Sequence, residues 1–589
     1  MGSSGSARLV GMESRPMDAG LLRGAARTQA RIALSLRALI LPALVLSALA
    51  GCSLVRSRSV WNPPLSPPPA RDDSGYVASA ESNFSAGIAA DAAGDPVALD
   101  YYYAAASQSW PLHAANAVSP TDPGSELYRA AVRKLMDSAA RYCRFDSARG
   151  ITLGDGTLLP IRYAGFVWQS ADFQCFQPVG SYASSSLLRR FSSTGVGVEY
   201  VVLSSETPRS PFIAPRQPFA ATAVFQPAGG PAPAAFTLDV YDPLRTAATE
   251  TGLPLARDLT APLAYWAAEN GDEGIVDFLD PAANNDTATL SMNEPFQPGK
   301  IPVVLVHGLA SSPITWSHLQ NDLRAQPCVM EKYQVWLFRY DTGSPFLATA
   351  AELRRQLAEL RQTYDPCRTD PNLSRVVLIG HSLGGLVSKL QVTSSGEELW
   401  RSAAKQPLNT IRTDPDTHNR LARSFYFTPS PDVNRVVYIA TPHQGSVYAT
   451  RCVGKISSSL VKEPPEWTAR HAQLTRDNPD AFGREMSRGV PTSVDLLDPD
   501  SCILQATNRL PYRPGVALHS IIGDDRWTLS EGRTDGVVAV SSARLGGVQS
   551  EIFVDASHTG IQLRQETSDE VIRILLAHAA QPTLPQGCP

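Results

Sequence analysis

Buried-strand patterns alternate with helical patterns in the second half of the chain. The strand candidates are Ile301–Val306, Gln334–Arg339 and Arg375–Ile379, and an amphipathic stretch, Leu347–Tyr364, lies between the last two. Strands that are apolar on both faces are typical of a parallel sheet that helices cover on both sides. Residues 295–589 are therefore predicted to form an α/β domain with a mostly parallel sheet.

The preceding part, residues 75–290, has a different pattern. Ala-rich helical stretches cover Leu99–Ser109 and Glu126–Tyr142, and the second places its apolar residues on one helical face. Short β-branched and aromatic segments bounded by Gly and Pro follow between residues 150 and 244. We expect an α+β accessory domain here. It contains no repeat and no catalytic constellation, so its role, whether carbohydrate, lipid or partner binding, stays open.

The N-terminus has the layout of a secretory signal peptide. Arginines, among them Arg31 and Arg37, precede an apolar run, Ala38–Ala50, which is too short to span a bilayer. The run ends in Leu49-Ala50-Gly51-Cys52, which resembles the lipobox of bacterial lipoproteins. The resemblance implies a signal peptide over residues 1–51, lipidation of Cys52 and membrane attachment, and Ser53 in place of Asp implies the outer membrane. The alternative is an ordinary signal with a chance cysteine.

Charge narrows the range of partners. The formal net charge is −4, and it falls to about −8 once residues 1–51 are removed, so nucleic acid is excluded as a partner. The Pro-rich stretch within residues 52–74 predicts an extended tether between the lipidated cysteine and the folded part.

Seven cysteines follow Cys52, and an exported protein meets an oxidising compartment, so disulfides are expected. Pairing of neighbours would join Cys143 to Cys175, Cys328 to Cys367 and Cys452 to Cys502, and would leave Cys588 free, although sequence alone does not fix the connectivity. No Cys-x-x-Cys pair occurs, so zinc or redox chemistry is not indicated, and we predict no metal and no cofactor.

A candidate nucleophile lies in Gly380-His381-Ser382-Leu383-Gly384, which has the G-x-S-x-G pattern of a nucleophile elbow. An elbow requires a strand, a tight turn and a helix, and the apolar strand Arg375–Ile379 directly precedes the motif. The two glycines remove side chains where the strand and helix backbones crowd together. A second turn, His307-Gly308-Leu309, follows another apolar strand. This context predicts that Ser382 is the nucleophile of an α/β-hydrolase fold.

A serine hydroxyl needs a base that removes its proton. His558 follows the strand-like Ile552–Val554 and precedes a helix, which is where this fold places the base. We therefore predict His558. The remaining histidines are expected to have other roles. His519 is expected to pack in the interior, and His578 is expected to lie on the surface. His307 and His381 are expected to shape the oxyanion turn, and His443 to be structural or to line a cavity.

Two sites compete for the acid that orients this base. Asp524 and Asp525 directly follow a strand, whereas Asp535 lies later, in Asp535-Gly536-Val537-Val538. The later segment, with a histidine 23 residues after the aspartate, resembles the acid and base segments of bacterial true lipases and related α/β hydrolases. The resemblance implies that Asp535 is the triad acid, and Asp524 or Asp525 would then be turn residues.

The oxyanion of an acyl-transfer intermediate needs two backbone N–H donors. The residue after the nucleophile, Leu383, is predicted to supply one, and the resemblance to lipases, whose His-Gly-x turn supplies the other, implies Leu309. Thr441-Pro442-His443-Gln444-Gly445-Ser446 is similar to a segment common in lipase-like α/β hydrolases. An insertion at about residues 445–512 is expected to form a cap, with surface elaboration as the alternative.

These observations predict a serine hydrolase that cleaves carboxylic esters, with an ester or a lipid as substrate. Acyl transfer to an alcohol, phospholipase activity and a non-catalytic envelope scaffold are the alternatives. The intact order of Ser, Asp and His argues against the scaffold. The sequence indicates neither the acyl-chain length nor the oligomeric state.

Overall fold

The computed structural model describes most of the chain after residue 74. The described residues are 75–117, 123–180, 187, 189–228, 235–270, 288–342, 344–447, 465–489 and 491–581. All of these described residues belong to one compact unit of the chain. The predictions on the signal peptide, on Cys52 and on the tether lie outside the described residues. Within the described residues, no helix is long and apolar enough to cross a membrane.

Three helices open the described part of the chain. They are α2 (Gly75–Ala92), α3 (Ala98–Ala115) and α4 (Pro123–Arg141). Helix α4 buries Leu127, Ala131 and Leu135, which are spaced four residues apart, as the amphipathic pattern predicts. Helices α3 and α4 contain most of the two predicted helical stretches, whereas α2 was not predicted.

A mixed sheet follows these helices, in the strand order β1-β2-β3-β8-β7-β6-β4. Its strands are β1 (Phe145–Asp146), β2 (Gly150–Thr152), β3 (Leu158–Ala164), β4 (Cys175–Pro178), β6 (Val198–Leu203), β7 (Pro218–Pro227) and β8 (Phe236–Tyr241). Strands β3 and β8 run parallel, and the other neighbouring pairs run antiparallel. The expected α+β character of this region is confirmed. The exact limits of the predicted domains stay predictions.

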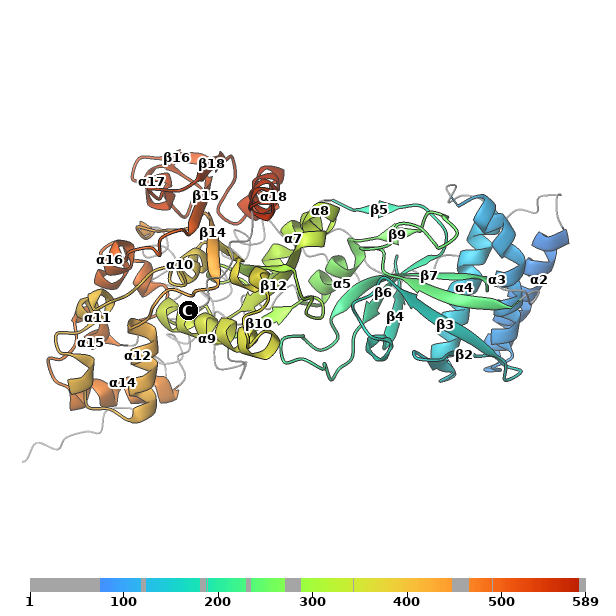
Figure 1. The fold of residues 1–589 in the computed structure, drawn as a ribbon, viewed down its shortest axis with the longest axis horizontal. Coiled ribbons are helices and arrows are strands. Elements are labelled where there is room, and N and C mark those ends of the chain that lie inside the picture. The colour runs from blue at the N-terminus through green and yellow to red at the C-terminus, as the bar shows by residue number, and fades with distance from the viewer. Residues whose placement is uncertain are drawn as a thin grey trace, which may run out of the picture. The chain divides into compact units, whose positions relative to one another are not determined.

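A second sheet occupies the C-terminal half, in the order β10-β12-β11-β13-β14-β15-β18 (Figure 1). Its strands are β10 (Thr289–Met292), β11 (Ile301–Val306), β12 (Tyr333–Arg339), β13 (Val376–His381), β14 (Val433–Ile439), β15 (Ala517–Gly523) and β18 (Ser550–Val554). Strand β10 pairs antiparallel with β12, and every other pair is parallel. The predicted α/β class with a mostly parallel sheet is confirmed.

Helices cover both faces of this sheet. In β11, Val304 and Val306 pack into a core with α9 (Phe346–Tyr364) and α10 (Leu383–Lys389). Val303 and Leu305 point to the other face and pack with α7 (Ser317–Arg324) and α18 (Gln565–Ala579). Successive side chains of a strand point to opposite faces, so two covered faces explain why the strand sequence is apolar throughout.

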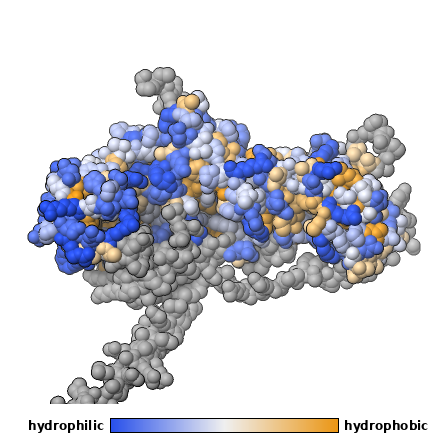
Figure 2. All heavy atoms as spheres, turned by 90° about the horizontal axis from the view of Figure 1, so that it is seen from below, coloured by the Kyte–Doolittle hydropathy of each residue, from blue (hydrophilic) through white to orange (hydrophobic). Residues whose placement is uncertain are grey.

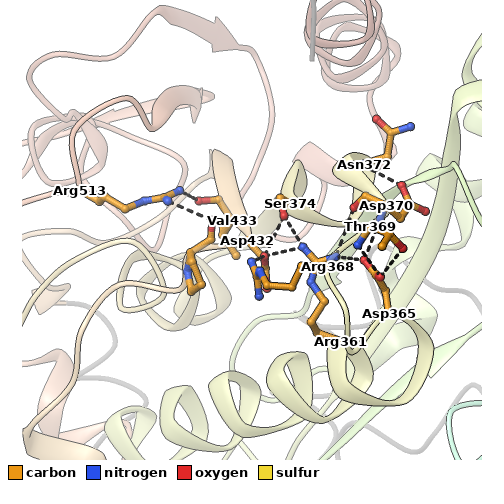
Figure 3. A network of polar contacts seen from close by, with 11 residues as sticks. Arg361, Asp365, Arg368, Thr369, Asp370, Asn372, Ser374, Asp432, Val433 and Arg513 are labelled. Carbon is orange, nitrogen blue, oxygen red and sulfur yellow. Dashed lines mark hydrogen bonds and ion pairs between the residues drawn. The ribbon is translucent and has the colours of Figure 1, made fainter. Parts of the chain in front are cut away.

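The amino ends of β13 and β14 are tied together by a polar network (Figure 3). Asp432, directly before β14, accepts hydrogen bonds from Arg361 at 2.9 Å, from Arg368 at 2.5 Å and from Ser374 at 3.1 Å. Arg361 also pairs with Asp365 at 2.7 Å. Because β13 runs from Val376 toward His381, this network lies at the opposite edge of the sheet from Ser382.

Two insertions contribute packed helices beside the sheet. Helices α11 (Glu398–Ala403) and α12 (Pro415–Phe425) precede β14, and α14 (Pro465–Asp477), α15 (Arg484–Arg488) and α16 (Cys502–Arg509) follow it. Backbone hydrogen bonds of 2.7 Å join Lys405 to Ala481 and Gly483 to Ala403, so the two insertions pack on each other. The described part of the segment at 445–512 is therefore well folded. Its action as a cap stays a prediction.

Two of the three expected disulfide bridges do not form. Cys143, Cys175, Cys328 and Cys367 are all free thiols, so the predicted pairings Cys143–Cys175 and Cys328–Cys367 are wrong. A disulfide requires Cα atoms about 4.4–6.8 Å apart and suitably directed side chains, and closeness along the chain ensures neither. The third predicted pairing includes Cys452, which lies outside the described residues, as does Cys588.

Apolar residues are interspersed among polar ones on the face shown in Figure 2, where hydrophilic residues predominate. In the described part of the chain, the exposed large apolar side chains are Tyr101, Leu158, Trp527, Leu529, Phe553 and Leu576. Single exposed apolar residues are normal on a folded protein.

Candidate active site

Ser382 occupies the tight turn between β13 and α10. Its backbone has φ 53° and ψ −123°, a positive φ that is rare for a residue with a side chain. A Cβ on Gly380 would lie 2.4 Å from the carbonyl oxygen of Gly384, and one on Gly384 would lie 2.2 Å from that of Val306. Only glycine fits at these two positions, because the contacts are with backbone. The turn therefore has the crowded geometry that the motif predicts.

Three of the predicted residues meet at the carboxyl edge of the sheet. The Nε2 atom of His558 lies 2.9 Å from the Oγ of Ser382. Its Nδ1 lies 2.7 Å from Oδ2 of Asp535. His558 is 8% exposed, Ser382 6% and Asp535 2%. The hydrogen bonds between them are therefore largely shielded from bulk water.

This geometry defines the proton positions in the resting site. A carboxylate only accepts hydrogen bonds, so the Nδ1 of His558 carries the proton that Asp535 accepts. A neutral imidazole then has a lone pair on Nε2, which accepts the hydroxyl proton of Ser382. The arrangement is therefore able to transfer the serine proton to the imidazole.

The loop of Asp535 is held by backbone donors and by the segment after β14. Oδ1 of Asp535 accepts hydrogen bonds from the amides of Val537 at 2.9 Å and Val538 at 2.7 Å. Ser446 donates to the carbonyl oxygen of Val537 at 2.5 Å, and Ser542 to that of Gly445 at 2.6 Å. Ser446 thus helps to position the loop of Asp535, a contact that sequence reasoning missed.

The competing carboxylates have other partners. Asp524 forms an ion pair with Arg533, and Asp525 pairs with Arg526 at 2.7 Å. The two arginines belong to a short hairpin, β16 (Arg526–Thr528) and β17 (Gly532–Thr534), that directly precedes Asp535. The structure brings neither Asp524 nor Asp525 to the imidazole of His558.

His519 and His578 lie away from Ser382. His519 is hydrogen-bonded to Ser550 at 2.7 Å, and burial lowers its pKa to about 4, in keeping with the predicted packing role. His578 was expected on the surface, and this is wrong. It is 1% exposed and lies 2.9 Å from the hydroxyl of Tyr333, because the last turn of α18 packs against the sheet.

The histidines of the two turns have structural contacts. His307 stacks on Tyr340, with ring centroids 4.3 Å apart, and its Nε2 accepts the Tyr340 amide at 3.3 Å. His381 lies 3.0 Å through Nε2 from the carbonyl oxygen of His558. Burial, and then the neighbouring imidazole of His558, lower the pKa of His381 to about 3. A neutral His381 therefore helps to position the loop of His558.

The two predicted oxyanion donors belong to the turn of Ser382 and to the turn that contacts it. Leu383 is the first residue of α10, where an amide has no intrahelical acceptor. Leu309 follows Gly308, and a Cβ on Gly308 would lie 3.1 Å from the Cβ of Ser382, so this turn packs against Ser382. The roles of both amides stay predictions.

No group of three or more His, Cys, Asp or Glu side chains that could hold a metal ion occurs among the described residues.

Several solved structures are similar to the C-terminal half. A Bacillus licheniformis lipase, BlEst2, in its mature form is 21% identical over 50% of this chain and 99% of that chain, with a TM-score of 0.29. A lipase-esterase related protein from Clostridium acetobutylicum is 12% identical over 49% of this chain and 99% of that chain, with a TM-score of 0.26. An esterase from Thermogutta terrifontis is 13% identical over 51% of this chain and 91% of that chain, with a TM-score of 0.26.

These likenesses are too distant to carry an argument about function. No curated protein matches the chain. The fold assignment rests instead on the strand order, on the turn at Ser382 and on a family match. Residues 303–574 match the model of the alpha/beta hydrolase family, so the C-terminal half of this chain has the α/β-hydrolase fold.

Proposed function

We propose that this protein is a serine hydrolase that cleaves carboxylic esters, with Ser382 as nucleophile, His558 as general base and Asp535 as the acid that orients the base. The observation that supports this proposal is the continuous series of hydrogen bonds from Ser382 through His558 to Asp535, of 2.9 and 2.7 Å. A serine hydroxyl becomes a competent nucleophile when an oriented imidazole accepts its proton.

The reaction begins when the Oγ of Ser382 attacks the ester carbonyl carbon while His558 accepts the hydroxyl proton at Nε2. The carbonyl π electrons move to the oxygen, and the amides of Leu309 and Leu383 stabilise this oxyanion. Loss of one such donor typically costs about 10²–10³ in rate. Asp535 stabilises the positive charge that develops on the imidazole.

Collapse of the intermediate breaks the bond to the alkoxide. His558 donates its proton to this leaving group, so an alcohol departs and Ser382 carries the acyl group. Water then attacks the acyl carbon, and His558 accepts a proton from it. When the second intermediate collapses, His558 returns that proton to Ser382 and the carboxylic acid is released.

The proposed substrates are acylglycerols or other carboxylic esters. This proposal rests on the resemblance of Asp535–Val538 and Thr441–Ser446 to segments of lipase-like hydrolases. A series of p-nitrophenyl esters of increasing acyl-chain length, assayed beside a phospholipid, tests both the reaction and its selectivity. We expect Ser382-dependent hydrolysis of at least one ester. No turnover of any ester by the wild-type protein would contradict the proposal.

We further propose that the protein is exported and anchored to the bacterial outer membrane through lipidated Cys52. The proposal is supported by the apolar run that ends in Leu49-Ala50-Gly51-Cys52. Metabolic labelling with a fatty acid is expected to label the full-length chain and not Cys52→Ser. Equal labelling of both chains, or labelling of neither, would contradict the anchor.

A further inference from the structure

A cluster of buried polar side chains lies between the C-terminal end of α10 and β14. It consists of Lys389, Tyr438, His443, Asn508 and Tyr512. Lys389 donates to Oδ1 of Asn508 at 2.7 Å, and Asn508 donates in turn to the carbonyl oxygen of His443. Lys389, Tyr438 and His443 are at most 2% exposed. These three side chains are therefore in the interior, and Asn508 and Tyr512 are half-buried.

The members of this cluster lie close to one another. The rings of Tyr438 and His443 meet edge to face, with centroids 4.8 Å apart. The ammonium of Lys389 lies 5.9 Å from the centre of the Tyr512 ring, and the hydroxyl of Tyr512 lies beside that of Tyr438. Burial lowers the pKa of His443 well below its usual value, and the charge of Lys389 lowers it further.

Two polar atoms of this cluster have no hydrogen-bond partner within the described part of the protein. They are both ring nitrogens of His443, whereas the hydroxyl of Tyr438 donates to that of Tyr512. Buried polar groups are almost always hydrogen-bonded, because burial without a partner costs about 1–3 kcal/mol for each group. An imidazole with neither nitrogen satisfied, at full burial, indicates that it contacts a bound species.

The charge of Lys389 is also uncompensated. Among the described residues, no carboxylate forms an ion pair with its ammonium, and burial is the sole cause that lowers its pKa to about 8. Buried charges in proteins are paired or bind ions. The end of α10 carries part of a negative charge, but a seven-residue helix supplies no full counter-charge.

The hydrogen-bonding groups of this cluster indicate the sign of the charge on the bound species. The lysine ammonium, the hydroxyl proton of Tyr512 and an imidazole N–H are all donors, and the amide oxygen of Asn508 is already occupied by Lys389. A cation would find no anionic ligand here. We propose that Lys389, Tyr438, His443 and Tyr512 form a buried binding site for a small monovalent anion of the size of chloride.

This site is separate from the proposed catalytic one. Lys389 ends the helix that begins directly after Ser382, so it lies about 10 Å farther along the helix axis. An anion there would join α10 to β14, through Tyr438, and to the turn of His443. The inference does not depend on esterase activity, and its test uses folding stability alone.

Thermal unfolding in different salts tests the proposal. The melting temperature of the full-length protein is measured as chloride or bromide replaces gluconate at constant ionic strength. We expect a saturating rise with either halide, since a ligand that binds the native state raises stability as its concentration exceeds Kd. Lys389→Met is expected to abolish this rise. Lys405→Met, at an exposed position nearby, is the matched control and should keep it.

Two further measurements keep the test decisive if Lys389→Met does not fold. Tyr512→Phe removes one donor and should raise the half-saturating halide concentration several-fold. Crystals grown in bromide should show an anomalous peak between Lys389 and the hydroxyl of Tyr512. A melting temperature that responds alike to halides and gluconate, or a site without bromide, would overturn the proposal in favour of ordered water.

Discussion

His381 donates a hydrogen bond from Nε2 to the carbonyl oxygen of His558, 3.0 Å away. A carbonyl oxygen only accepts, so this nitrogen carries the ring proton, and a pKa of about 3 keeps the ring neutral. The bond joins the turn of Ser382 directly to the loop of His558, although the two histidines are 177 residues apart in sequence. It helps to fix where the imidazole of His558 lies relative to Ser382.

Replacement of His381 by Phe removes this bond and keeps an aromatic ring. A net hydrogen bond is worth about 1 kcal/mol, so we expect kcat to fall about 5-fold with little change in KM. His381→Gln retains a donor and should recover part of the loss. Steady-state kinetics on a water-soluble ester measure both variants. A change in KM alone would show that His381 acts on substrate binding instead.

The assignment of the acid is tested by comparing two aspartates. Asp535→Asn removes the carboxylate that holds the Nδ1 proton of His558, and in serine proteases the equivalent change lowers kcat about 10⁴-fold. We expect a loss of about 10³-fold or more. Asp524→Asn, which disturbs the pair with Arg533, should leave kcat within about 2-fold of wild type. The reverse ranking of the two variants would exclude Asp535 as the acid.

The polar network of Figure 3 is expected to contribute to stability and not to catalysis. Asp432→Ala leaves the buried guanidinium of Arg361 without one of its carboxylate partners, and breaking such a pair costs about 3–5 kcal/mol. The matched control is Glu359→Ala, which breaks an exposed pair with Arg355 and should cost less than about 1 kcal/mol. Urea denaturation measures both free energies of unfolding. Equal losses in the two variants would contradict this assignment.

Buried histidines make stability depend on pH. His381, His519 and His578 have folded-state pKa values of about 3, 4 and 3, below the usual 6.5. Below pH 6.5 the unfolded chain binds protons that the folded chain does not. The contribution of these histidines to the free energy of unfolding is therefore fully present above this pH and declines as the pH falls toward 4. Each histidine contributes a slope of up to about 1.4 kcal/mol per pH unit. Urea denaturation between pH 7 and 5 should show this decline, and His519→Gln should reduce its slope. A stability that rises on acidification would refute this account.

The strand and turn patterns predicted much of the fold and the site. Ile301–Val306 and the motif at Ser382 are local signals, since period and glycine spacing reflect backbone constraints that act within a few residues. The choice of His558 followed from chain order. Asp535 could be preferred to Asp524 only through a resemblance, because both follow a strand-like segment and the sequence does not reveal which one reaches the imidazole.

Other features depend on contacts between distant segments and were not predictable. The pairing of Ser446 with the acid loop spans 91 residues, and the burial of His578 depends on how α18 packs on the sheet. The bridges Cys143–Cys175 and Cys328–Cys367 were predicted from chain proximity, which does not determine the distance between side chains. The polar cluster around Lys389 likewise combines residues from three separate parts of the chain.

Covalent labelling of the intact protein with a fluorophosphonate probe tests the central proposal most directly. Attack by the Ser382 oxygen on phosphorus would expel fluoride and leave a stable adduct, which peptide mass spectrometry locates. We expect one adduct per chain, on Ser382. We expect no adduct in folded Ser382→Ala, and much slower labelling of His558→Ala than of the wild-type protein. Labelling that is absent from the wild-type protein, or that persists in Ser382→Ala, would contradict the proposed mechanism.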